Sequence, residues 1–265
     1  MNNINSDKSN FFMERILISF YFKKIFKNIR LIFCLIFILI PLANSFIAIQ
    51  NLINSSVEIN QITLDSSIFL GSFLSFSIIY ANTLPIIISC DIISEDFSKK
   101  TALVLYSAVS RKKVMISKIL SITSYLLFFQ SISFIIFSIM SFVTLGLVIS
   151  VNISILGFFL IFINMIFIFS LTFCFSALTR NTIMALLIPL FYTYNEQLLI
   201  LFNLKFLSYN QQVQTILLFI QSILLNGNVS LDYIELLISF IIFFSLPLII
   251  FIITYKLFKR VDIRL

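Results

Sequence analysis

The sequence predicts an all-α membrane protein with six transmembrane helices, and three observations lead to this expectation. Hydrophobic residues make up 60% of the 265-residue chain and charged residues only 11%, whereas soluble domains carry about 45–50% apolar and about 25% charged residues. Apolar runs of the roughly 20 residues needed to cross a bilayer recur along the whole chain. Lys and Arg gather between alternate runs, as the positive-inside rule describes.

Six apolar stretches each have the length of a membrane-spanning helix. The third is longer than a crossing requires, which indicates a tilted helix or one that extends into water. The first, second, fifth and sixth stretches each contain one proline, which membrane helices tolerate. The predicted spans cover residues 29–49, 68–92, 117–147, 153–178, 183–203 and 234–255.

The charge distribution predicts the orientation of these helices. Of the 18 Lys and Arg residues, only Lys205 lies outside the N-terminal segment, the second–third loop, the fourth–fifth loop and the C-terminal segment. Because cytoplasmic segments collect Lys and Arg, we expect a multi-pass protein of a prokaryotic cell membrane with both termini in the cytoplasm. The same rule explains the net charge of +7, so nucleic acid is not an expected partner.

The segment before the first span is predicted to be helical as well. A polar residue recurs every four positions from Arg15 to Lys27, with apolar residues between. We therefore expect residues 11–28 to form an amphipathic helix that lies on membrane lipids at the interface. The alternative is a basic flank that only sets topology.

Residues 196–227 are harder to assign, because two apolar pieces, 197–207 and 213–225, are each about half a span long. A crossing by the second piece would place the C-terminal cations outside, against the charge rule. We therefore expect external helices over residues 204–227 that dip into the outer leaflet or lie on it. The polar residues 208–214 are the predicted turn between the two pieces.

The loop between the second and third spans has more structure than a connector needs. An acidic pair, Glu95 and Asp96, is followed by a charged stretch and then by an apolar piece too short to cross a membrane. Ser110 can cap the helix that follows. This pattern predicts a helix over residues 93–110 that docks a cytoplasmic partner. A solvated connector with snorkelling cations is an equal alternative on the residues alone.

This loop resembles the corresponding loop of type-2 ABC exporter permeases, the membrane subunits of ATP-driven transporters. The family pattern is an acidic pair, then Thr, Leu, Ser and Pro-Val-Ser-Arg, then a Lys that enters the third helix. The chain departs from it at Ala108, where Pro is usual, and at Ser117, where Gly or Ala is common. The matching residues are Glu95, Asp96, Lys100, Thr101, Leu105, Ser107, Val109, Ser110, Arg111 and Lys118.

The resemblance extends to the interfacial helix, the six spans and the external helices, and it implies partners. The second–third loop would be a coupling helix that touches a separate ATP-binding ATPase subunit, and a second copy or a sibling permease would complete the transporter. A secondary carrier or a non-transport scaffold subunit is the alternative. The implied partner-binding residues are Glu95, Asp96, Lys100, Thr101, Leu105, Ser107, Ser110 and Arg111.

The chain lacks the residues that catalysis would require. None of its four glycines belongs to a G-x-x-x-x-G-K-[ST] phosphate loop, so ATP and Mg are expected on the partner and no cofactor on this chain. It has no His, which argues against an intramembrane serine protease or metalloprotease. Its three cysteines are scattered in apolar runs, so they are expected to pack rather than to bind metal.

Polar groups inside spans are candidates for function by default. Asn82 and Thr83 lie beside Pro85 in the second span, and Glu196 lies in the outer part of the fifth. These three residues are the predicted pathway or dimer seam. The alternatives are helix–helix hydrogen bonding for Asn82 and Thr83, and for Glu196 a carboxylate that caps the start of an external helix.

Overall fold

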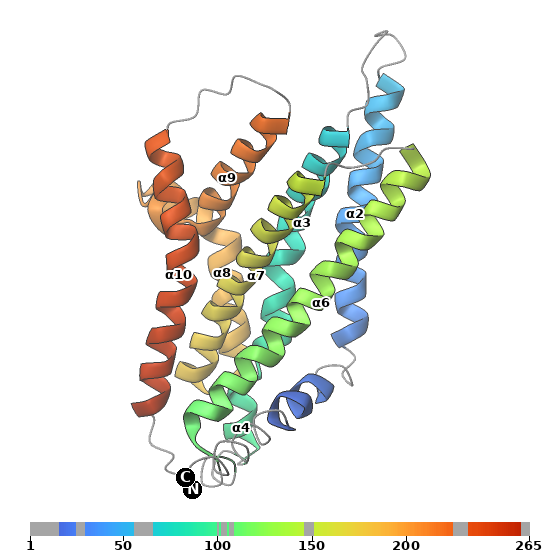
Figure 1. Cartoon of the computed structure of the whole chain (residues 1–265). Coiled ribbons are helices and arrows are strands. Elements are labelled where there is room, and N and C mark those ends of the chain that lie inside the picture. The colour runs from blue at the N-terminus through green and yellow to red at the C-terminus, as the bar shows by residue number, and fades with distance from the viewer. Residues whose placement is uncertain are drawn as a thin grey trace, which may run out of the picture.

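The computed structural model describes residues 16–24, 30–55, 66–99, 101, 105, 109–145, 151–224 and 233–260 (Figure 1). Over these residues the chain is helical and contains no strand, which confirms the all-α prediction. A short helix covers residues 16–24. The elements that follow are α2 (Arg30–Ser55), α3 (Ser66–Ser89), α4 (Ser94–Ser98), α6 (Arg111–Leu145), α7 (Val151–Thr179), α8 (Thr182–Leu201), the 3₁₀ turn η2 (Lys205–Leu207), α9 (Tyr209–Leu224) and α10 (Tyr233–Arg260).

Four stretches of described helix are long and apolar enough to cross a membrane: Leu70–Ser98, Arg111–Val143, Ser154–Thr179 and Tyr233–Lys259. They correspond to the second, third, fourth and sixth predicted spans and indicate a multi-pass membrane protein. Helices α2 and α8 occupy the first and fifth predicted positions, and membrane crossing by these two stays a prediction.

Helix α7 forms the centre of the bundle. It packs against α3, α6, α8, α9 and α10, and side chains on several sides of it, such as Ile161, Phe169 and Phe173, are fully buried. The outer faces of α6 and α10 instead expose large apolar side chains, for example Val143 and Leu248. Such a lipid-like surface around a buried central helix is the pattern of a helical membrane bundle.

Gly157 lets α7 approach α3 closely. A Cβ atom at this position would lie 2.7 Å from Cδ2 and 3.3 Å from Cγ of Leu74. Leu74 is fully buried and has little room to move aside. The glycine therefore allows these two helices to pack closely, as small residues commonly do in membrane bundles.

Gly157→Ala is expected to lower the free energy of unfolding by about 1–3 kcal/mol, because the added methyl group overpacks the contact. A thiol-reactive dye that reports thermal exposure of the buried Cys90 would measure this as a lower melting temperature. In a Leu74→Ala background the same change should be neutral or stabilising, since the methyl group then has space. Equal destabilisation in both backgrounds would contradict this account.

Several polar segments meet at one end of the bundle, where α4 and the start of α6 lie (Figure 1). The Ser121 hydroxyl of α6 donates to the carbonyl of Ile18, 3.1 Å away, and Arg111 Nη1 donates to the carbonyl of Lys259, 3.2 Å away. Helix 16–24 and the end of α10 therefore lie on the same side as α4. Residues 11–15 and 25–28 of the predicted interfacial helix lie outside the described residues.

The predicted turn over residues 208–214 is wrong, because residues 209–214 form the first turns of α9. The change of direction occurs earlier, after α8 ends at Leu201, and includes Asn203 with a positive φ of 59°. Helix α9 packs against α7 and α10 in the half of the bundle away from α4 (Figure 1). Capping side chains let this polar stretch begin a helix inside the bundle.

Candidate functional site

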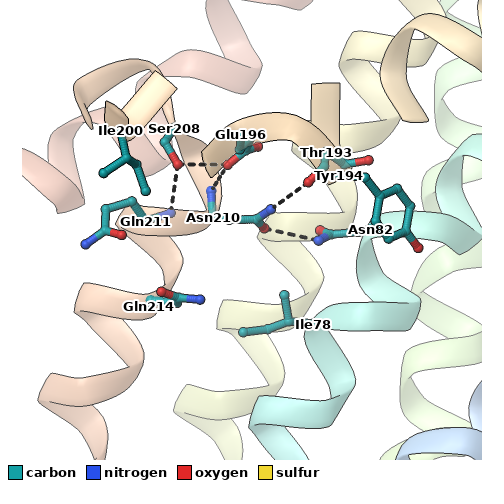
Figure 2. A pocket seen from close by; sticks show the side chains of 10 residues that line it. All are labelled: Ile78, Asn82, Thr193, Tyr194, Glu196, Ile200, Ser208, Asn210, Gln211 and Gln214. Carbon is teal, nitrogen blue, oxygen red and sulfur yellow. Dashed lines mark hydrogen bonds between the residues drawn. The ribbon is translucent and has the colours of Figure 1, made fainter. Parts of the chain in front are cut away.

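A chain of three asparagine side chains crosses the bundle and joins α7, α3 and α9. Asn164 Nδ2 donates to Asn82 Oδ1 at 3.1 Å, and Asn82 Nδ2 donates to Asn210 Oδ1 at 3.1 Å (Figure 2). Asn210 Nδ2 then reaches the carbonyl of Thr193 in α8 at 3.4 Å. Asn82 and Asn164 are 9% and 0% exposed, so this relay fixes the positions of four helices from within.

Glu196 caps the N-terminus of α9. Its Oε2 accepts hydrogen bonds from the Asn210 backbone N–H at 2.8 Å and from the Ser208 hydroxyl at 2.9 Å. Ser208 Oγ accepts in turn from the Gln211 backbone N–H at 3.3 Å. A carboxylate at this place also faces the positive end of the helix dipole, which is the capping role considered for Glu196 as the alternative to a pathway.

Thr83 stays outside this network, although it is adjacent to Asn82. Its hydroxyl donates within its own helix, to the carbonyl of Ile79 at 3.1 Å. This back-bonding is common for Thr in membrane helices. The structure thus brings Asn82 and Glu196 together through Asn210, but it gives Thr83 a local contact.

A cavity of about 300 Å³ lies between α3, α8 and α9 at this network. Asn82, Glu196 and Asn210 line one side of it, while Gln214 and Ile78 point toward one another from facing helices (Figure 2). The volume is at the lower end of the range for small-molecule sites. Polar groups that converge in a mostly apolar bundle give this cavity the composition of a ligand pocket.

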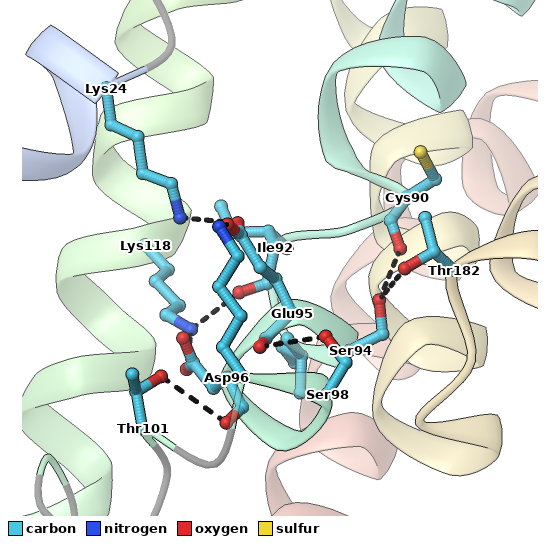
Figure 3. Close-up of polar contacts among 12 residues, drawn as sticks. Lys24, Cys90, Ile92, Ser94, Glu95, Asp96, Ser98, Thr101, Lys118 and Thr182 are labelled. Atoms are coloured by element: carbon cyan, nitrogen blue, oxygen red, sulfur yellow. Dashed lines mark hydrogen bonds and ion pairs between the residues drawn. The ribbon is translucent and has the colours of Figure 1, made fainter.

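The second candidate site is α4, which follows the turn at the end of α3. Its Asp96 carboxylate forms a buried ion pair with Lys118 of α6 (Figure 3), and Lys118 Nζ also donates to the carbonyl of Ile92 at 2.5 Å. The side chains of Lys118 and Asp96 are only 1% and 9% exposed. Buried charges need such complete pairing, because each loses its hydration.

Helix 16–24 packs over this ion pair. The Tyr21 ring lies 5.2 Å from Lys118 Nζ, within the range of a cation–π contact. Burial, followed by the charges of Asp96 and Glu95, raises the pKa of the Tyr21 phenol well above its ordinary value, so the phenol stays protonated. Lys24 pairs with Glu95, which also pairs with Lys99, and so ties this helix to α4.

The opposite side of α4 is bound to the turn between α7 and α8. Ser176 Oγ accepts from the backbone N–H groups of Ile93 and Ser94 at 3.3 and 3.1 Å. The Ser94 and Thr182 hydroxyls are 2.8 Å apart. Arg180, which has a φ of 53° in this turn, lies 4.9 Å from the centroid of the Phe97 ring. Five residues of helix are thus fixed to several distant segments.

The predicted partner-binding residues fall into different environments. Asp96 points inward to Lys118, and Arg111 caps α10 by donating to the carbonyls of Phe258 and Lys259. Thr101 and Ser110 are exposed, and Leu105 is half-buried. Glu95 is half-buried in its ion pairs, and Lys100 and Ser107 lie outside the described residues.

Several residues of both sites were missed by the sequence reasoning. Lys24 and Ser176 contact α4 from positions far away along the chain, and no local pattern marks such contacts. Ser208 and Asn210 could have been found, because Ser followed by an amphipathic run is a helix-start signal. Asn164, a polar residue inside the fourth predicted span, was not selected as a candidate, although it donates to Asn82.

No family model matches the sequence, and no curated protein matches it. Among the residues that the structure describes, no cluster of His, Cys, Asp and Glu could hold a metal ion.

Proposed function

We propose that this chain is the membrane-spanning permease subunit of an ATP-driven exporter, and that a separate ATPase subunit docks on α4 and the residues after it. The observation that supports this proposal best is the attachment of α4. Its side chains and flanking backbone contact helix 16–24, α6, and the turn between α7 and α8. A force applied to this short helix would therefore reach most of the bundle.

The mechanics of this arrangement suit coupling. A five-residue helix cannot store a conformational change by itself, so a displacement must pass to the elements it contacts. The Asp96–Lys118 pair would carry it to α6, and the Ser94–Thr182 contact would carry it to α8. In this proposal the six spans cross the membrane with both termini in the cytoplasm, and two permease copies, or this chain and a sibling, form the pathway.

The chemistry of ATP would belong entirely to the partner. This chain supplies no phosphate loop, so ATP and Mg would bind on the ATPase subunit, and this chain would only transmit its motion. Thr101 and Ser110 are exposed and would form part of the docking surface. Asp96 holds α4 to α6 in this scheme and does not touch the partner.

Site-specific crosslinking tests the docking surface directly. A photoreactive benzoylphenylalanine at Thr101 is expected to capture an ATP-binding protein in native membranes. Benzoylphenylalanine at position 207 is the matched control and should capture no ATP-binding protein. Leu207 is 44% exposed and belongs to η2, not to the end of the bundle that holds α4. Recovery of the chain without any ATPase in mild detergent would count against the proposal, and transport that needs an ion gradient but no ATP would favour a secondary carrier.

A further inference from the structure

The cavity between α3, α8 and α9 carries one formal charge, that of Glu196, and no Lys or Arg is among the described residues that line it. Glu196 is 4% exposed, and its Oε1 atom makes no hydrogen bond within the described part of the chain. The Tyr192 hydroxyl lies beside this carboxylate, but its single proton is donated to the carbonyl of Leu207 at 2.7 Å. A buried carboxylate oxygen without a donor is unfavourable, so a donor brought by a ligand would be stabilised.

The rest of the lining suits the body of an organic molecule. The Gln214 side chain faces Ile78 across the cavity (Figure 2) and offers an amide oxygen as a further acceptor. Ile78 and Ile200 contribute apolar surface, and Tyr194 contributes an aromatic ring. Aromatic rings attract cations over their faces.

The negative charge of the cavity and the side chains that line it argue against anions and divalent metal ions as ligands. An anion would be repelled by Glu196. A Ca²⁺ or Mg²⁺ ion needs about six or more oxygen ligands and usually more than one carboxylate, whereas Glu196 is the one carboxylate among the described residues that line the cavity. A primary ammonium group has one positive charge and three N–H donors, which matches one carboxylate and neighbouring amide oxygens.

We infer that this cavity binds a primary alkylammonium group, with the Glu196 carboxylate as its counter-ion and the apolar walls around its alkyl chain. The inference does not require the proposed transport function, because binding needs no ATPase subunit. The same ammonium chemistry occurs in free amines and in ethanolamine headgroups of lipids, so both sources must be tested.

Calorimetric titration of the purified full chain in phosphatidylglycerol nanodiscs is the direct test, with n-hexylammonium as the probe. Hexanol and hexanoate are the neutral and anionic controls of the same length. Hexylammonium should bind saturably, and both controls should bind at least about tenfold more weakly, as expected for loss of a charge-assisted hydrogen bond. Equal binding of the three probes would overturn the inference.

Two variants locate the binding. Glu196→Gln removes the charge but keeps a side-chain oxygen for the α9 cap, and it should weaken hexylammonium binding by about tenfold or more. Glu235→Gln, the same change at an exposed residue of α10, should bind like the unchanged chain. Unchanged binding by Glu196→Gln would refute the assignment.

A third variant keeps the test decisive if Glu196→Gln does not fold. Gln214 is exposed and does not support the cap, so Gln214→Leu should fold and should weaken hexylammonium binding several-fold. Full affinity in this variant would also overturn the inference. Phosphatidylethanolamine added to the nanodiscs should reduce the apparent affinity if the natural ammonium comes from lipid, and should leave it unchanged if the natural ligand is a free amine.

Discussion

Replacement of Lys118 by Met is expected to lower the free energy of unfolding by about 3–5 kcal/mol, the usual cost of leaving a buried charge without its partner. Lys118 and Asp96 are both buried, and the lysine also holds the carbonyl of Ile92. Its removal leaves the carboxylate and this carbonyl without the donor they share. Thermal exposure of Cys90 to a thiol-reactive dye would measure the loss.

Two comparisons separate the ion pair from general damage. Lys112→Met makes the same change at an exposed position of the same helix and should have little effect, as surface substitutions usually do. The double variant Asp96→Asn with Lys118→Met should be more stable than Lys118→Met alone, because the buried carboxylate that has lost Lys118 is then replaced by a neutral amide. If the double variant were the less stable of the two, the pair would not be the source of the effect.

The buried pair also bears on coupling. If α4 transmits motion to α6 through Asp96 and Lys118, a partner can dock on Lys118→Met without driving transport. Crosslinking from position 101 should therefore persist in this variant at temperatures where it stays folded, whereas ATP-dependent transport should fall. Loss of both together would mean that the pair shapes the docking surface rather than transmitting motion through it.

The long apolar helices were predictable from the sequence, because hydrophobic length alone determines them. The third predicted span began at residue 117, whereas α6 begins at Arg111, since the helix continues past the apolar run through its basic residues. The sequence also placed Asp96 and Lys118 in one motif, but their ion pair depends on the turn over Cys90–Ile93, which brings α4 back to α6. Spacing along the chain carries no information about that turn.

The start of α9 was not predicted, although Ser208 before an amphipathic run is a helix-start signal. Residues 208–214 are polar except for Val213 and were interpreted as a turn, but several of their polar side chains form the α9 cap and line the cavity. Glu196 and Asn210 are far enough apart in the sequence that only the fold joins them. Asn82 and Glu196 were still found as candidates, because a polar side chain inside an apolar run is visible without any knowledge of its partner.

Removal of the central amide of the relay should have the second large effect. Asn82→Ala leaves Asn164 Nδ2 without an acceptor and Asn210 Oδ1 without its Asn82 donor, and each such buried group costs about 1–3 kcal/mol. The measured contribution of a side-chain hydrogen bond between membrane helices to stability averages only about 0.6 kcal/mol. Because the variant breaks two bonds at once, one of them to the fully buried Asn164, we expect a loss of about 1–3 kcal/mol in the same dye assay.

The adjacent Thr83 supplies the control, since its hydroxyl bonds only within α3, and Thr83→Val should cost less than Asn82→Ala. A double-mutant cycle with Asn164→Ala then tests the relay itself. If Asn164 acts through Asn82, the double variant should lose less stability than the sum of the two single variants, because the second substitution removes a group already left unpaired. Strict additivity would show that the two amides contribute separately, and the four helices would then be held together by packing rather than by a connected polar network.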